Sequence, residues 1–167
     1  MTAYRTIKLP SFEGVNSGQT ATLRMPRGGT YHQVFLEYSG VTLEQMTEIR
    51  LVINGDVHQR WRGGAAQLDR INQFEGRQAA NGVLTIDFDR HNLRTRDAEE
   101  LTALGTGNPD DDNPITSLEL EIDIASGASA PTLNATARRS GASVSGIIKR
   151  VRNFVYNPGA SGDFEIS

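Results

Sequence analysis

The stretch I-T-S-L-E-L-E-I-D-I-A, residues 115–125, decides the fold of this chain, because its side chains alternate between apolar and polar. Apolar residues occupy every second position and polar residues fill the positions between them: Leu118, Leu120, Ile122 and Ile124 against Ser117, Glu119, Glu121 and Asp123. A period of two is typical of a strand with one buried and one solvated face, whereas a helix would scatter the same residues around its axis. Pro114 and Ser126-Gly127 delimit the run, so we expect a central strand of about nine residues.

Other short runs of alternating or β-branched residues predict further strands, at residues 4–9, 20–25, 30–38, 48–53, 57–61, 82–88, 131–139, 147–156 and 163–167. Asn54-Gly55 predicts a tight hairpin of type I′ between two of them.

Helical spacing is confined to three short places. Residues 65–74 favour a helix with Ala65, Leu68, Ile71, Asn72 and Phe74 at helical spacing, and residues 97–104 favour a second, capped by Thr95 or Asp97. Thr42 with Gln45 forms a capping-box pattern for a further short helix. The whole pattern predicts an all-β fold, an antiparallel β-sandwich of the jelly-roll type with eight or more strands and two short helices in the connections. Residues 1–167 fit a single domain.

Composition excludes several classes of function. The chain has no cysteine, which excludes disulfides, thiolate zinc sites and cysteine nucleophiles. The net charge of -3 argues against a general nucleic-acid binder. No apolar run approaches the roughly 20 residues that span a bilayer, and the first residues lack the apolar core of a secretory signal, so we expect an intracellular product.

No catalytic motif stands out. His32, His58 and His91 fall in different predicted elements at no metal-binding spacing, and the chain has no nucleophile elbow, phosphate-binding loop or dinucleotide fingerprint. Asp87 and Asp89 lie on one side of a strand end, where they could bind a metal or act as acid and base; the simpler interpretation is a solvated, outward face. We therefore expect no enzyme.

Two charged segments are candidates for binding. The loop N-P-D-D-D-N at residues 108–113 offers Asp110, Asp111 and Asp112 as oxygen ligands for calcium, with a solvated acidic loop as the alternative. Basic residues gather in the last third of the chain: Arg138, Arg139, Lys149, Arg150 and Arg152. Antiparallel pairing of the two strands that carry them would merge them into one patch, for which we prefer a protein contact over sequence-specific nucleic acid.

The long excursion at residues 89–113 is a candidate subunit interface. Its apolar residues Leu93, Leu101 and Leu104 lie among charges of both signs, including Arg94 and Arg96, which suits a contact with a polar rim. The alternative is a loop that folds its leucines onto its own sandwich.

Several strings resemble the N-terminal jelly-roll domain of P2-like viral coat proteins, the major capsid proteins of membrane-containing icosahedral bacteriophages and their prophages. They are P-S-F-E-G-V-N-S-G-Q-T-A-T-L-R at 10–24, Y-H-Q-V-F-L at 31–36, I-D-F-D-R-H-N-L-R-T-R-D-A-E-E-L-T-A-L-G-T at 86–106, S-L-E-L-E-I-D-I-A at 117–125, A-P-T-L-N-A at 130–135, R-V-R-N-F-V-Y at 150–156 and G-D-F-E-I-S at 162–167.

The resemblance implies a coat protein made in the bacterial cytoplasm and incorporated into the virion. It implies homotrimers and contacts with other virion proteins and with an internal viral membrane, and it favours the calcium site. The family pattern has two jelly rolls, so either a second one follows Ser167 or this protein is a relative with a single roll. The competing hypothesis is a lectin-like jelly roll that binds carbohydrate, with Tyr31, Tyr38, Trp61 and Tyr156 as its aromatic candidates. We expect Trp61 to be a core residue. A cupin-like metal enzyme ranks third, because it would need clustered histidines.

Overall fold

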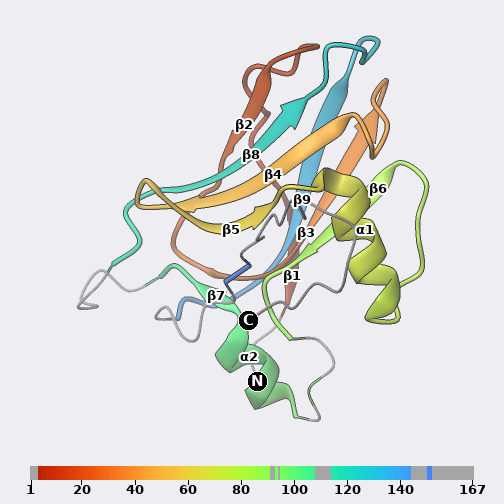
Figure 1. Cartoon of the computed structure of the whole chain (residues 1–167). Coiled ribbons are helices and arrows are strands. Elements are labelled where there is room, and N and C mark those ends of the chain that lie inside the picture. Colours follow the sequence, from red (N-terminus) through yellow and green to blue (C-terminus); the bar gives the residue numbers. More distant parts are fainter. Residues whose placement is uncertain (1–3, 91–92, 94, 108–113, 144–149, 152–167) are drawn as a thin grey trace, which may run out of the picture.

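The computed structural model describes residues 4–90, 93, 95–107, 114–143 and 150–151. In this part of the chain, two antiparallel sheets face each other around one hydrophobic core (Figure 1). The first sheet has the order β1 (Arg5–Lys8), β9 (Thr132–Ser140), β3 (Thr30–Ser39) and β6 (Val83–Asp87), with β7 (Leu104–Gly105) beside β3. The second has the order β2 (Thr20–Arg24), β8 (Leu118–Ile124), β4 (Met46–Ile53) and β5 (Asp56–Trp61).

The strand pairs derive from one long hairpin whose tip lies between β4 and β5. From the tip outward, β4 pairs with β5, β3 with β6, β2 with β8 and β1 with β9. Rolling this double ribbon brings β9 beside β3 and β8 beside β4, which are the remaining long pairs. Strands wound in this way form a jelly roll, so the predicted fold class is confirmed.

The tip of the hairpin has the predicted chemistry. Asn54 and Gly55 have φ values of 54° and 86°, the left-handed conformations that a type I′ turn requires. The Asn54 side chain also reaches the opposite strand: its Oδ1 accepts hydrogen bonds from the backbone N–H groups of Thr116 at 2.6 Å and Ser117 at 3.1 Å. The turn is therefore tied to the start of β8.

Strand β8 holds the second sheet together, as its alternation predicts. It lies between β2 and β4, and its buried and half-buried residues alternate along its whole length. Leu120 and Ile122 are fully buried against the other sheet's core residues. Trp61 is also in the core, 3% exposed, as expected.

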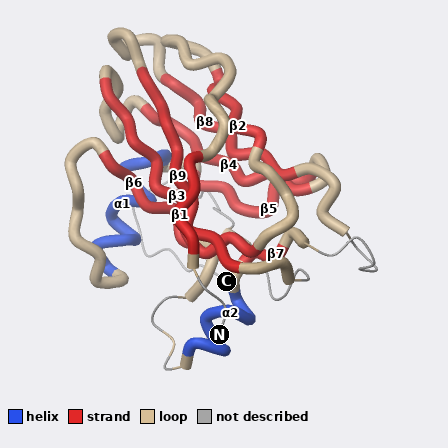
Figure 2. The backbone as a smooth tube through the Cα atoms, turned by 180° about the vertical axis from the view of Figure 1, so that it is seen from behind, coloured by secondary structure: helices blue, strands red, loops and turns tan. Residues whose placement is uncertain are grey.

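Two helices lie in the connections. Helix α1 (Gly64–Phe74) packs against β4, β5 and β6, with Ala65, Leu68 and Asn72 buried. Phe74 is the last residue of the helix, as its spacing predicts, but it is 93% exposed and does not pack against the sheets. Helix α2 (Arg96–Thr102) lies beyond the end of the sheets, next to β7 (Figures 1 and 2), and the Thr95 hydroxyl accepts a hydrogen bond from Ala98 N, as predicted.

The short helix predicted at Thr42 is absent. Thr42 and Gln45 do exchange the two capping-box hydrogen bonds, but they close a turn, because β4 begins at Met46 and leaves no length for a helix. Of the strands predicted at 147–156 and 163–167, only Arg150 and Val151 belong to the described residues. None of the helices in the described part of the chain has the length and hydrophobicity to cross a bilayer.

Candidate functional site

A buried chain of hydrogen bonds links Asp89, His32 and Ser140 at one end of the first sheet. His32 Nδ1 lies 3.0 Å from Asp89 Oδ2, and His32 Nε2 lies 2.8 Å from the Ser140 hydroxyl. His32 is fully buried, and Asp89 is 6% exposed. Because the Asp89 carboxylate accepts a hydrogen bond from His32 Nδ1, the other ring nitrogen, Nε2, faces the Ser140 hydroxyl and holds it in place.

Tertiary pairing brings these three residues together. His32 lies near the start of β3, Ser140 is the last residue of β9, and Asp89 follows the end of β6; β3 pairs with both of the other strands. The β3–β9 register shifts between Tyr31 and Gln33, which makes His32 an extra residue in β3. A β-bulge re-aims the side chain that it carries, and bulges are frequent next to functional sites.

The groups follow the order of a serine hydrolase triad: hydroxyl, imidazole, carboxylate. Acyl transfer also needs hydrogen-bond donors for an oxyanion. The nearby Gly28 and Gly29 amides are occupied, since they donate to the Thr106 carbonyl at 3.2 Å and to the Thr106 hydroxyl at 3.3 Å. The arrangement therefore fixes and polarises the Ser140 hydroxyl, while the Gly28 and Gly29 amides are not free to stabilise a tetrahedral intermediate.

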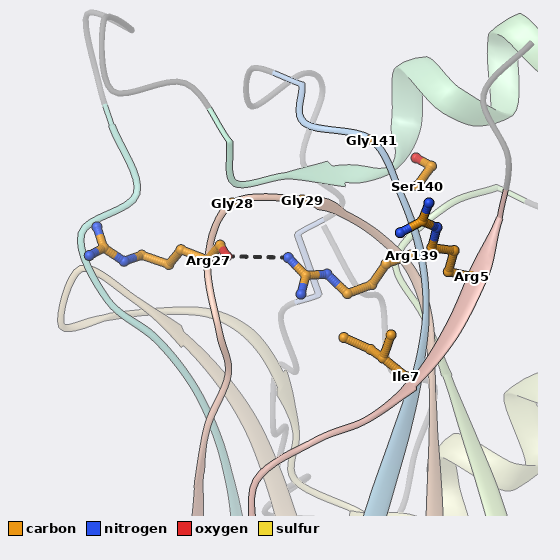
Figure 3. Close-up of a pocket in the computed structure, with 8 residues that line it drawn as sticks. All are labelled: Arg5, Ile7, Arg27, Gly28, Gly29, Arg139, Ser140 and Gly141. Carbon is orange, nitrogen blue, oxygen red and sulfur yellow. Dashed lines mark hydrogen bonds between the residues drawn. The ribbon is translucent and has the colours of Figure 1, made fainter.

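Ser140 lines a pocket of about 540 Å³ whose lining includes three arginines. The pocket is lined by Arg5, Ile7, Arg27, Gly28, Gly29, Arg139, Ser140 and Gly141. In Figure 3, the Arg5 and Ser140 side chains lie on the same side of the pocket. The Arg139 side chain is directed toward the Arg27 carbonyl, to which its Nη2 donates a hydrogen bond of 3.3 Å. The Arg27 guanidinium points the other way and donates to the Ile115 carbonyl at 3.2 Å.

The two β9 arginines each lie over an aromatic ring. The Arg138 guanidinium is 4.0 Å from the centre of the Tyr4 ring, and that of Arg139 is 4.4 Å from the centre of the Tyr31 ring. The Tyr4 ring in turn meets His32 edge-on at 4.7 Å. Burial raises the pKa of Tyr31 to about 12, against a smaller opposing effect of Arg139, so the phenol is neutral and supplies no counter-charge.

The strand pairing assumed for the basic patch was wrong. Arg138 and Arg139 are in β9, between β1 and β3, whereas Val151 forms a parallel bridge with Gln59 of β5 in the other sheet. Arg150 instead lies near His58. Burial lowers the pKa of His58, and the positive charge of Arg150 lowers it further. Lys149 and Arg152 are outside the described residues.

The predicted interface loop divides into buried and exposed parts. Leu104 is a core residue, 2% exposed, because β7 pairs it with Tyr31 of β3; it cannot be an interface anchor. Leu101 on α2 is 58% exposed, and Leu93 is half-buried. Arg94 and the side chain of Arg96 are outside what the structure describes.

The carboxylates at the end of β6 are buried, which overturns the interpretation as a solvated face. Asp87 accepts two hydrogen bonds of 2.6 Å from Arg77 and one of 3.0 Å from Gln33, and Asp89 accepts from His32. No three His, Cys, Asp or Glu side chains are grouped for a metal within the described residues. Asp110, Asp111 and Asp112, the predicted calcium ligands, lie outside them.

Within the described residues, the aromatic side chains considered for carbohydrate binding do not form an exposed platform. Tyr31 and Trp61 are buried and Tyr38 is half-buried, while Tyr156 is outside the described residues. The site that the structure does assemble, the Asp89–His32–Ser140 chain beside the arginine pocket, was missed in the sequence. Its members are separated by 57 and 108 positions, and no local spacing could have marked them.

The winding of the strands places the chain in the jelly-roll class, which includes viral capsid domains, lectins and cupins. Within that class, the model of the viral coat protein P2 N-terminal domain matches residues 6–143, and the chain belongs to this family. The predicted resemblance is confirmed.

Two known proteins support the same relationship. The major capsid protein P2 of Pseudoalteromonas phage PM2 is 28% identical over 153 residues, which cover 89% of this chain and 54% of that protein. The crystal structure of the major capsid protein P2 from bacteriophage PM2 superposes with a TM-score of 0.76 at 26% identity, over 86% of this chain and 52% of that one. The chain thus spans about half the length of these relatives.

A more distant structure shares the fold alone. PBCV-1 VP54, in a structure fitted into a reconstruction of the virophage Sputnik, superposes with a TM-score of 0.54 at 14% identity and covers 86% of this chain and 43% of that one.

Proposed function

We propose that the chain is a structural domain of a major capsid protein, which self-assembles into a viral shell and carries out no catalysis. The observation that carries this proposal is the family match over residues 6–143, together with the superposition on a capsid protein over most of the chain. The protein would be made in the host bacterial cytoplasm and reside in the virion.

We also propose how the protein assembles and what it contacts in the virion. We infer homotrimers, contacts with other virion proteins and with an internal membrane, and a second jelly roll beyond Ser167. The length of the relatives supports the last point, since this chain covers 54% of the PM2 protein. A calcium ion at Asp110, Asp111 and Asp112 remains a prediction, which addition and chelation of calcium would test by a change in Tm.

We propose that α2 contributes to a subunit interface. Leu101 is 58% exposed, and the same helix carries Asp97, Glu99 and Glu100, so an apolar anchor is surrounded by charge. A charged residue at the anchor would be buried without a partner, which costs several kcal/mol in an interface.

Size-exclusion chromatography with light scattering on the natural product of the gene tests this proposal. Wild type should form a defined oligomer, and Leu101→Asp should weaken it by at least about tenfold in Kd. Val57→Asp, at an apolar residue of β5 that is 48% exposed, is the matched control and should assemble normally. Arg94→Glu with Arg96→Glu should weaken assembly while β-sheet circular dichroism stays unchanged.

A wild-type protein that is strictly monomeric at high concentration would contradict the coat function. Normal assembly of both the Leu101 and the double arginine variants would instead remove α2 from the interface and leave the coat function standing.

A further inference from the structure

We propose that the pocket beside Ser140 binds the phosphate or sulfate group of a ligand, held by the Arg5 and Arg139 guanidinium groups and by the Ser140 hydroxyl. Of the residues that the structure describes, those that line the pocket include three arginines and no acidic residue, in a chain whose net charge is -3. Among the described residues, no carboxylate forms an ion pair with Arg5, Arg27 or Arg139. Like charges gathered at a partly buried wall repel one another, and a bound dianion would relieve this repulsion.

Arg139 has unused hydrogen-bonding capacity. A guanidinium group offers five N–H donors. In the described part of the chain, one of them is bonded, to the Arg27 carbonyl, while Nε is buried without a partner. The neutral Tyr31 ring supports the guanidinium from one side and does not neutralise it. Arginine held in this way is suited to oxyanions, which accept paired hydrogen bonds.

Gly29 allows Arg139 to lie against the chain at the pocket wall. A Cβ atom at Gly29 would lie 2.5 Å from Arg139 Nη2, a distance at which one of the two groups must move. The neighbouring Gly28 has a φ of 92°, where side-chain-bearing residues are strained. The loop sequence thus keeps the arginine in its position and the pocket open.

The Ser140 hydroxyl is held by His32, whose Nε2 lies 2.8 Å away. A hydroxyl group can both donate and accept hydrogen bonds, so Ser140 can donate to an oxygen atom of a bound anion.

His32 is held by groups from three elements. Asp89 after β6 lies 3.0 Å from Nδ1, Ser140 of β9 lies 2.8 Å from Nε2, and the Tyr4 ring before β1 covers the imidazole edge-on. The volume of about 540 Å³ falls in the range of small-ligand pockets, so we expect the anionic group to belong to a larger molecule or to be accompanied by water.

Sulfate is the probe, because it is a dianion at neutral pH. Isothermal titration of the chain with sulfate should show saturable binding. Arg5→Gln, at an exposed residue whose loss should not unfold the protein, should weaken binding by about tenfold, the effect of one charge-assisted hydrogen bond. Ser140→Ala should also weaken binding.

Arg70→Gln, at an exposed position of α1, is the control with the same change of charge and should bind as wild type does. Unchanged binding in the Arg5 variant, an equal loss in the Arg70 variant, or no saturable binding of sulfate to the wild type would each overturn the proposal.

Two further titrations identify the source of the anionic group. Vesicles of phosphatidylglycerol that bind the chain, release it with sulfate and fail to bind Arg5→Gln would assign the pocket to a lipid headgroup. Saturable binding of inorganic phosphate without vesicle binding would assign it to a free phosphate compound. Binding of neither, or equal binding of phosphatidylcholine vesicles, would count against an oxyanion site.

Discussion

Arg50 contacts three carboxylates on the outer face of the second sheet. It donates to Glu121 at 2.8 Å, to Glu48 at 2.9 Å and to both oxygens of Asp123 at 2.7 and 2.9 Å. The Arg50 hydrogen bond is the main cause that lowers the pKa of Asp123. Burial acts to raise the pKa of Glu48, but hydrogen bonds from Arg50 and Arg60 outweigh it and the pKa lies below its ordinary value.

These lowered pKa values predict a loss of stability in acid. A carboxyl group whose pKa is lower in the folded state stabilises the protein above its unfolded value, 3.8 for Asp123 and 4.5 for Glu48, and loses that contribution as the pH falls through the folded value. Arg50→Met should lower the free energy of unfolding by about 2–4 kcal/mol at neutral pH, because Glu121 and Asp123 lose this cation and Glu48 keeps only Arg60.

Urea denaturation at several pH values tests this prediction. The difference between wild type and Arg50→Met should shrink as the pH drops below about 4, where the carboxylates become protonated in both proteins. Arg24→Met is the control, because Arg24 makes exposed ion pairs of 3.4 and 3.6 Å and should contribute less than about 1 kcal/mol. A difference that stays constant with pH would show that Arg50 acts through packing alone.

Gly64 allows the start of α1 to lie directly against the backbone of β4. Gly64, at the start of α1, has a φ of 63°, and a Cβ atom there would lie too close to the Met46 carbonyl of β4. Gly55, at the hairpin tip, has a φ of 86°, and a Cβ atom there would meet no other atom within 4 Å. Both glycines therefore have a left-handed backbone conformation that would strain any other residue, but only Gly64 lacks space for a side chain.

This pair separates strain from steric contact. Gly55→Ala should cost about 1–2 kcal/mol, the penalty for a left-handed residue with a side chain. Gly64→Ala should cost about 3 kcal/mol or more, since α1 must also move away from β4. Thermal unfolding followed by circular dichroism measures both. Equal costs for the two substitutions would mean that α1 adjusts its position without loss.

The winding of the jelly roll predicts how the whole molecule folds. The hairpin tip pairs Ile53 with Asp56, whereas the ribbon ends pair Arg5 with Arg139. Chain closure over long separations costs entropy before the contacts form, so the tip should form early and the β1–β9 pair late, with refolding in milliseconds to seconds.

Stopped-flow refolding checks this order. Asn54→Ala, which removes a residue suited to the positive φ of the hairpin turn, should mainly slow folding, and Ile7→Ala in β1 should mainly speed unfolding. The reverse pattern would place the nucleus at the ribbon ends.

The sequence by itself determined many of the elements, although not β7 or the turn at Thr42. Period-two alternation identified β8, Asn54-Gly55 identified the hairpin, and Thr95 was one of the two caps predicted for α2. The physical reason is that side-chain period, positive φ and helix capping are local properties, each decided by a few consecutive residues.

The tertiary structure decided which elements meet. It turned Leu104 into a core residue through β7, and paired β9 with β1 and β3 in place of the strand that carries Arg150. Alternation tells which face of a strand is buried but not its partner or register, and a bulge such as that at His32 breaks the period itself. The Asp89–His32–Ser140 chain and its arginine pocket therefore arise only when the ribbon is rolled.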